Sequence, residues 1–140
     1  MKKIFIDTSA LVALFDRSDN NHQKAKTLLE IIRNNKIKLL MSDYIFDETI
    51  TTVLSNAGHK TAIRIGEFIL GSNIVELSWL DESIIMKAWE YFKRHSDKEY
   101  SFTDCTTFIL MEEMKLSNFF AFDEDFVQAG FIDFSSQYSI

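Results

Sequence analysis

Short apolar runs alternate with longer amphipathic segments along most of the chain. The apolar runs are rich in Ile, Phe, Leu and Val and predict β-strands at residues 3–7, 36–42, 73–79 and 118–122. Apolar positions spaced three and four apart predict helices at residues 9–15, 22–34, 44–57, 60–70, 82–95 and 102–114. The segment FIDF at residues 131–134 predicts a short edge strand. Because strands and helices alternate, we expect an α/β fold with a mainly parallel sheet and helices on both faces.

The chain has the size of one domain, and we expect residues 1–140 to form a single unit. It contains no proline, no Gly/Ser-rich linker and no internal repeat, and its hydrophobic fraction of 46% is enough for a core. Cys105 is the single cysteine and cannot form an internal disulfide. No apolar run approaches the roughly 20 residues of a membrane span, so we expect a soluble, cytoplasmic protein without a membrane partner.

The net charge of −6 argues against a general nucleic-acid coat protein, because such proteins are usually basic. It does not argue against a nuclease. Carboxylates that bind a divalent cation count as negative in the formal sum, and the bound ion reverses the local field.

Acidic residues follow the predicted strands from several separate parts of the chain. Asp7 ends the first strand, Glu48 lies early in the helix after the second, and Asp123 and Asp125 follow the last. Asp104 begins the helix that leads into that last strand. The carboxyl ends of parallel strands meet at one edge of a sheet, where ligands bind. Clustered carboxylates are the usual ligands of Mg²⁺ and Mn²⁺, so we predict a divalent-metal site at this edge.

Each acid also has a purely structural explanation. Asp7 is a suitable N-cap for the following helix, and Ser101 with Asp104 fits a capping box. Aspartate is common in turns such as residues 123–125. Glu48 falls opposite an apolar stripe of its own helix, which is typical of a solvated position. That stripe comprises Phe46, Ile50, Val53, Leu54 and Ala57.

Four sequence segments carry a family resemblance that spans nearly the whole chain. They read FIDTSALVALFD, DETITTVL, SFTDCTTFILMEEMKL and FAFDEDF. In this order and spacing they resemble the PIN-domain ribonucleases, in particular the VapC-type toxins of type II toxin–antitoxin systems. The resemblance implies that Asp7, Glu48, Asp104 and Asp123 are the catalytic metal ligands, with Asp125 beside or in place of the fourth. It also implies a role for the hydroxyl of Thr8 or Ser9 next to the first acid.

The resemblance implies an endoribonuclease that hydrolyses RNA phosphodiester bonds with one or two Mg²⁺ or Mn²⁺ ions. It further implies a homodimer that a small antitoxin protein silences. Two alternatives remain open: an RNA-processing nuclease outside a toxin–antitoxin system, and a catalytically silent binding module. A receiver-like signalling domain would need an acidic pair after the first strand and a Lys after the last, and the sequence has neither.

Two surface features are expected to serve these partners. Candidate cations for holding RNA are Lys60 with Arg64, and the stretch 93–98 with Lys93, Arg94, His95 and Lys98. The helix at residues 60–70 carries apolar side chains around more than one side, which predicts either a dimer contact or a central place in the core. These side chains are Ile63, Ile65, Phe68 and Ile69.

Overall fold

The computed structural model describes residues 2–140 and has a central five-stranded sheet in which all paired strands are parallel. The strands are β1 (Lys3–Ile6), β2 (Lys38–Ser42), β3 (Val75–Ser78), β4 (Asn118–Phe120) and β5 (Ile132–Asp133). Their spatial order is β3-β2-β1-β4-β5. The α/β class and the short edge strand in the tail are therefore confirmed.

Seven α-helices connect or follow these strands, and six of them lie where the hydrophobic pattern predicts. They are α1 (Thr8–Phe15), α2 (His22–Asn34), α3 (Asp43–Ala57), α4 (His59–Gly71), α5 (Glu82–Arg94), α6 (Phe102–Glu113) and α7 (Asp125–Gln128). The sequence pattern predicts neither α7 nor the 3₁₀ turn Phe134–Gln137, because each spans only four residues and shows no helical period.

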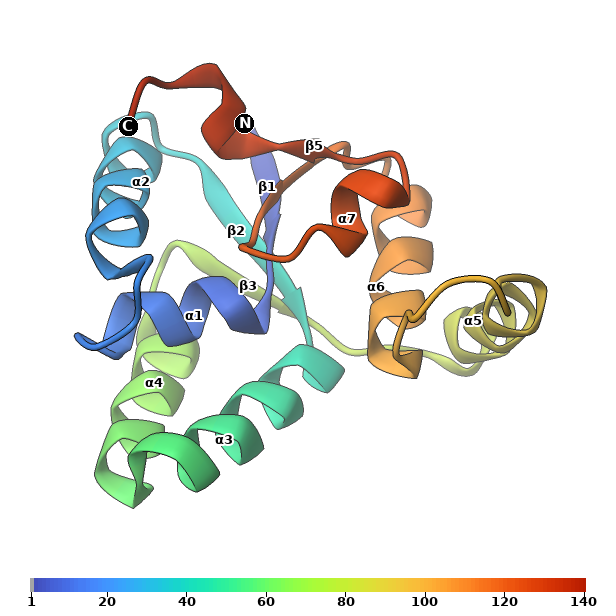
Figure 1. Ribbon diagram of the computed structural model, residues 1–140, viewed down its shortest axis with the longest axis horizontal. Coiled ribbons are helices and arrows are strands. Elements are labelled where there is room, and N and C mark those ends of the chain that lie inside the picture. The colour runs from blue at the N-terminus through green and yellow to red at the C-terminus, as the bar shows by residue number, and fades with distance from the viewer. Residues whose placement is uncertain (1) are drawn as a thin grey trace.

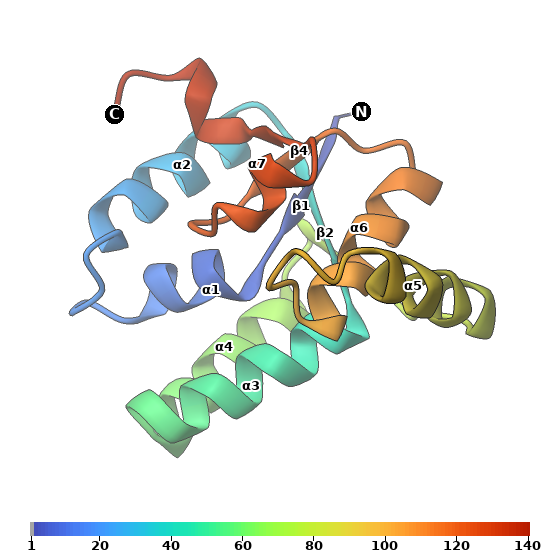
Figure 2. The ribbon, with the colours of Figure 1, turned by 45° about the vertical axis from the view of Figure 1, so that its right-hand side comes forward.

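The strand order divides the helices between the two faces of the sheet (Figures 1 and 2). From β1 the chain steps to β2 and β3 in one direction, and from β4 it steps to β5 in the other. Right-handed crossovers then place α1 to α4 on one face and α5 to α7 on the opposite face. The reversal lies between β1 and β4, which makes the carboxyl ends of these two strands the expected ligand site.

The core contains fully buried phenylalanines that join β1 and β4 to α6 and α7. Phe126 of α7 lies 4.8 Å from Phe119 and 5.4 Å from Phe108, measured between ring centroids. Phe5 contacts the same ring at 6.5 Å. Since each of these rings has no more than about one hundredth of its surface exposed, the short helix α7 is anchored although it is only four residues long.

Helix α3 buries a different stripe from the one its sequence predicts. Ile45, Thr49 and Val53 face the interior, while Leu54 is exposed and Phe46 is half-buried. Helix α4 packs alongside α3 (Figure 2). Phe46, Ile50 and Leu54 of the predicted stripe line an apolar groove between these two helices.

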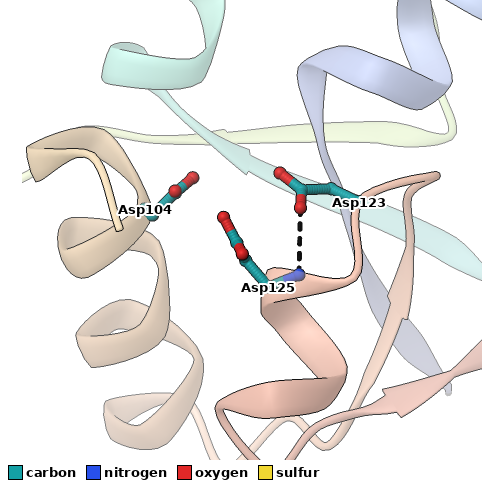
Figure 3. Close-up of side chains that lie close together, drawn as sticks. All are labelled: Asp104, Asp123 and Asp125. Carbon is teal, nitrogen blue, oxygen red and sulfur yellow. Dashed lines mark hydrogen bonds between the residues drawn. The ribbon is translucent and has the colours of Figure 1, made fainter. Parts of the chain in front are cut away.

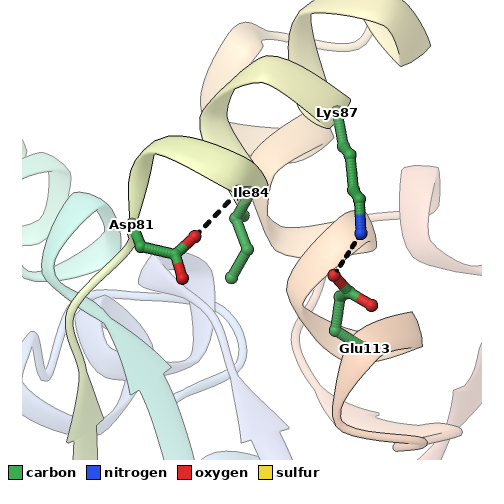
Figure 4. A network of polar contacts seen from close by, with 4 residues as sticks. All are labelled: Asp81, Ile84, Lys87 and Glu113. Atoms are coloured by element: carbon green, nitrogen blue, oxygen red, sulfur yellow. Dashed lines mark hydrogen bonds and ion pairs between the residues drawn. The ribbon is translucent and has the colours of Figure 1, made fainter.

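Helix α5 lies at the edge of the molecule and packs against α6 (Figure 4). Asp81 caps it by accepting a hydrogen bond from the Ile84 amide at 2.9 Å, as predicted. Lys87 forms an ion pair with Glu113 of α6 at 2.6 Å. Ala88 is the one buried residue along this helix, so most of its surface is open to solvent.

Candidate active site

Asp7 lies at the carboxyl end of β1, where the sheet meets the first helix. Its amide donates to the Phe120 carbonyl of β4 at 3.1 Å, and its carboxylate accepts from the Ser9 amide at 3.4 Å and the Ser9 hydroxyl at 3.1 Å. The residue therefore caps α1, and only 5% of it is exposed. Burial, with smaller contributions from the Glu48 and Asp104 carboxylates, raises the pKa of Asp7 to about 7.

Ser9 joins the two strand ends between which the topology reverses. Its hydroxyl donates to Asp7 and accepts a hydrogen bond from the Phe122 amide at 2.9 Å. The first acid and the loop after β4 are thus held together by one side chain. The sequence resemblance marks this hydroxyl, but only the structure shows which segment it reaches.

Glu48 points toward Asp7 from the second turn of α3. Its Oε1 accepts a hydrogen bond from the Thr8 hydroxyl at 2.6 Å, and the Thr8 hydroxyl also lies 3.0 Å from that of Thr49. Glu48 is half-buried, so the solvated position that its helical period suggests is wrong. Thr49 is fully buried, and the sequence pattern does not predict its part in this chain of contacts.

Three further carboxylates converge on one another from α6 and from the start of α7 (Figure 3). Asp104, Asp123 and Asp125, which we call the acidic triad, each offer one oxygen within 4.8 Å of the others. Asp104 also completes the predicted capping box, since its Oδ2 accepts from the Ser101 amide at 3.0 Å and its amide donates to the Ser101 hydroxyl at 3.0 Å. The Asp125 amide donates to Asp123 Oδ1 at 2.9 Å.

The electrostatics of the triad reflect crowding of like charges in a partly buried place. Burial, together with the nearby Asp123 and Asp125 carboxylates, raises the pKa of Asp104 to about 6. Burial and the Asp123 carboxylate also raise the pKa of Asp125. Protonated carboxyls at near-neutral pH are a sign that the site favours an added positive charge.

The structure thus gathers all five predicted acids at the carboxyl edge of the sheet, in two groups. Asp7 and Glu48 lie on the side of β1 and α3, outside the close triad on the side of α6 and α7. Asp104 connects the two groups, because its carboxylate, like that of Glu48, helps to raise the pKa of Asp7. The carboxylates at this edge are hard oxygen donors, which can hold Mg²⁺ or Mn²⁺. The triad itself consists of carboxylates alone, without a thiol or imidazole ligand.

Comparison with known proteins agrees with this architecture. Residues 4–132 match the family model described as the PIN domain. The chain is 34% identical over 130 residues to the 23S rRNA-specific endonuclease VapC20 of Mycobacterium tuberculosis (strain H37Rv), covering 93% of this chain and 96% of that protein. It is 26% identical over 113 residues to a VapC ribonuclease of Archaeoglobus fulgidus, covering 79% of this chain and 71% of that protein.

Solved structures show the same fold. A crystal structure of Mycobacterium tuberculosis VapC20 superposes with a TM-score of 0.84 at 33% identity, over 93% of this chain and 97% of that chain. The structure of VapBC-1 from nontypeable Haemophilus influenzae superposes with a TM-score of 0.60 at 16% identity, over 91% of each chain, which shows likeness of fold alone. The chain therefore belongs to the PIN-domain family. Within that family it is a nuclease of the VapC type.

Asp7→Asn is expected to stabilise the metal-free protein above about pH 7, by on the order of a few kcal/mol. The folded protein holds the Asp7 proton up to a pKa of about 7, whereas the unfolded chain releases it near 3.8, so wild-type stability falls as pH rises between these values. Asn can keep the cap on α1 without the buried charge. Urea unfolding at a series of pH values would measure the gain, which should vanish below about pH 4.

The matched control is Asp16→Asn. Hydrogen bonds from Ser18 lower the pKa of this exposed carboxyl, so its replacement should remove stability rather than add it as pH rises. An Asp7→Asn protein that is no more stable than the wild type at alkaline pH would contradict the buried, crowded charge described above.

Proposed function

We propose that this protein is a divalent-metal-dependent endoribonuclease whose active centre is the carboxyl edge between β1 and β4. The observation that carries the proposal is the acidic triad, three carboxylates within 4.8 Å of one another with Asp7 and Glu48 beside them. Such a group repels itself without a cation, so its presence at the topological switch point is better explained by ligand binding than by stability.

The donor set fits Mg²⁺ or Mn²⁺. Asp104, Asp123 and Asp125 would hold the ion, and Asp7 and Glu48 would complete or extend the site. When bound, a divalent ion supplies a water of lowered pKa and offsets negative charge on the phosphate. The acidic triad contains both Asp123 and Asp125, so we propose both of them as ligands of the ion.

Neighbouring hydrogen-bond donors orient these acids. Ser9 fixes one face of the Asp7 carboxylate, and Thr8 fixes Glu48 through a short hydrogen bond. The Ser101 amide donates to one oxygen of Asp104, and this carboxylate offers an oxygen within 4.8 Å of oxygens of Asp123 and Asp125. A carboxylate that is held in this way does not have to be ordered when the ion and the substrate bind.

The substrate that we propose is RNA. The support is the relative at 34% identity, which is named a 23S rRNA-specific endonuclease and whose crystal structure is described as that of a Sarcin-Ricin loop cleaving toxin. That alignment covers nearly all of both chains. Hydrolysis through metal-held carboxylates needs no side-chain nucleophile, and none is present in the triad.

A second protein chain is expected to silence the nuclease. The groove between α3 and α4 has a volume of about 360 Å³ and includes the half-exposed Leu54, Ile63 and Leu70. An amphipathic helix of a small antitoxin would bury these side chains. The sequence places four apolar residues around more than one side of α4. Two of them, Ile65 and Ile69, lie in the core and do not line the groove.

No helix among residues 2–140 combines the length and the hydropathy that crossing a bilayer requires.

A second apolar surface lies on and beside α5, where Trp79, Met86, Trp89 and Phe92 are exposed. Soluble monomers rarely keep a patch of this kind, so we propose that this surface forms a twofold homodimer.

Asp104→Asn is expected to reduce Mg²⁺-dependent cleavage of total RNA by at least about a hundredfold while the protein stays folded. Asn can still accept the Ser101 amide, so the cap on α6 is kept and only the charge is lost. Asp97→Asn removes one charge from the exposed loop before the same helix and should leave the rate unchanged. Full activity of the purified Asp104→Asn protein would overturn the assignment of the site.

The homodimer is expected to be visible by light scattering as twice the 16.3 kDa mass of the chain. Trp89→Glu places a charge in the centre of the exposed α5 surface and should yield a folded monomer. Leu70→Glu changes the α3–α4 groove by the same kind of substitution and should leave the dimer intact. A wild-type mass of 16.3 kDa that does not change with concentration would show that the dimer is wrong.

A further inference from the structure

Four cations of this acidic protein gather around one hollow that the sequence pattern does not predict. Two members of the predicted basic stretch are already neutralised, since Lys93 pairs with Glu90 at 3.0 Å and Lys98 with Asp97 at 3.9 Å. Arg64, from the other predicted pair, instead lines a hollow together with Arg17, Lys26 and Arg33. We call this feature the basic hollow.

The basic hollow lies between α1, α2 and α4, on one face of the sheet (Figure 1). His22, Lys26 and Arg33 lie four and seven residues apart on α2 and so share one side of that helix. Arg17 comes from the turn after α1, and Arg64 lies over the ring of Phe15 at 5.7 Å. The volume of the hollow is about 400 Å³.

The floor of the basic hollow is apolar and keeps the cations at its rim. Phe15 and Phe68 contact each other at 5.4 Å between ring centroids, and both are half-buried. Leu14 and Leu29 complete the floor. Their packing gives the hollow a fixed shape that does not depend on the four flexible cationic side chains.

The four cations have no anionic partner among the described residues. No ion pair or side-chain hydrogen bond within residues 2–140 involves Arg17, Lys26, Arg33 or Arg64. No Asp or Glu lines the hollow, and Glu67, three residues after Arg64 on α4, lines the α3–α4 groove and forms no ion pair with Arg64. Four unpaired positive charges around one hollow, in a chain of net charge −6, make a local anion-attracting field.

Helix α1 connects the basic hollow to the active centre. Asp7 caps its first turn, and Phe15, its last residue, lies in the floor of the hollow. Eight helical residues span about 12 Å, so the two places are separated by a few nucleotides of extended RNA. A carboxylate cluster repels phosphates, and a substrate therefore needs positive charge beside it rather than within it.

We infer that the basic hollow binds backbone phosphates of the RNA substrate, a few nucleotides away from the bond that is cut. This inference rests on the proposed ribonuclease function and deepens it. Arg is suited to this task because its planar guanidinium donates to two phosphate oxygens at once. Contacts of this kind hold a strand in position without reading its bases. The hollow would thus supply affinity, and the carboxyl edge would supply the chemistry.

The test compares two double variants that each remove two positive charges. Lys26→Gln with Arg33→Gln changes the rim of the hollow, whereas Lys2→Gln with Lys115→Gln changes the chain before β1 and before β4, outside the lining of the hollow. All four side chains are exposed. Binding of fluorescent poly-uridylate RNA is measured by anisotropy over a range of salt concentrations, in an Asp104→Asn background that prevents cleavage. The KM and kcat for a long RNA are measured in the otherwise wild-type protein.

The hollow variant is expected to bind RNA about tenfold more weakly near physiological salt, and the slope of log affinity against log salt should fall by about one and a half. Its KM should rise by a similar factor while kcat stays the same, because the carboxylates are untouched. The control pair should change these quantities by less than about twofold. Equal effects of the two pairs, or no effect of either, would overturn the inference.

Three outcomes separate this inference from others. If the hollow variant keeps its RNA affinity but loses binding of poly-glutamate, the occupant is an acidic protein segment and the inference is wrong. If the wild-type protein neither binds nor cuts RNA, the proposed function falls, and the inference falls with it. If the wild type cuts RNA and the two pairs behave alike, only the inference about the hollow falls.

Discussion

Hydrogen bonds at the starts of helices hold mutually repelling carboxylates in one place. Asp7 accepts from Ser9 at the start of α1, and Asp104 accepts from the Ser101 amide at the start of α6. Helix N-termini carry free amide donors and a partial positive charge, which favour a carboxylate even where burial opposes its ionisation. The carboxylates of the site therefore repel one another, but the capping hydrogen bonds hold them in place. Capping explains the places of Asp7 and Asp104 structurally, and it also orients these acids at the edge where we propose that a cation binds.

The rest of the fold serves this arrangement. The reversal of strand order between β1 and β4 makes room at the carboxyl edge, and the phenylalanine core keeps the short helix α7 in place so that Asp125 faces Asp104. One apolar surface lies between α3 and α4, the other on and beside α5, and the basic hollow lies at the far end of α1. The functions that we propose for the carboxyl edge, the hollow and the two apolar surfaces thus fall on different surfaces of one small domain.

Sequence patterns predict the elements that have a clear hydrophobic period and the acids that follow strands. They predict the parallel α/β sheet, the caps at Asp81 and Ser101, and the five acids as one group. They miss α7, which is too short to show a period, and they misplace the buried face of α3 because α4 covers part of its surface. The basic hollow draws its cations from three separate segments, and no local pattern can reveal that the chain brings them together.

The central claim is that the carboxyl edge binds a divalent cation through the acidic triad. Crystals soaked in Mn²⁺ test it most directly, because the anomalous scattering of manganese locates the ion without reference to activity. We expect a peak among the carboxylates of Asp104, Asp123 and Asp125, and no peak at this place in the Asp104→Asn protein. A peak elsewhere on the molecule, or an equal peak in the Asp104→Asn protein, would contradict the claim.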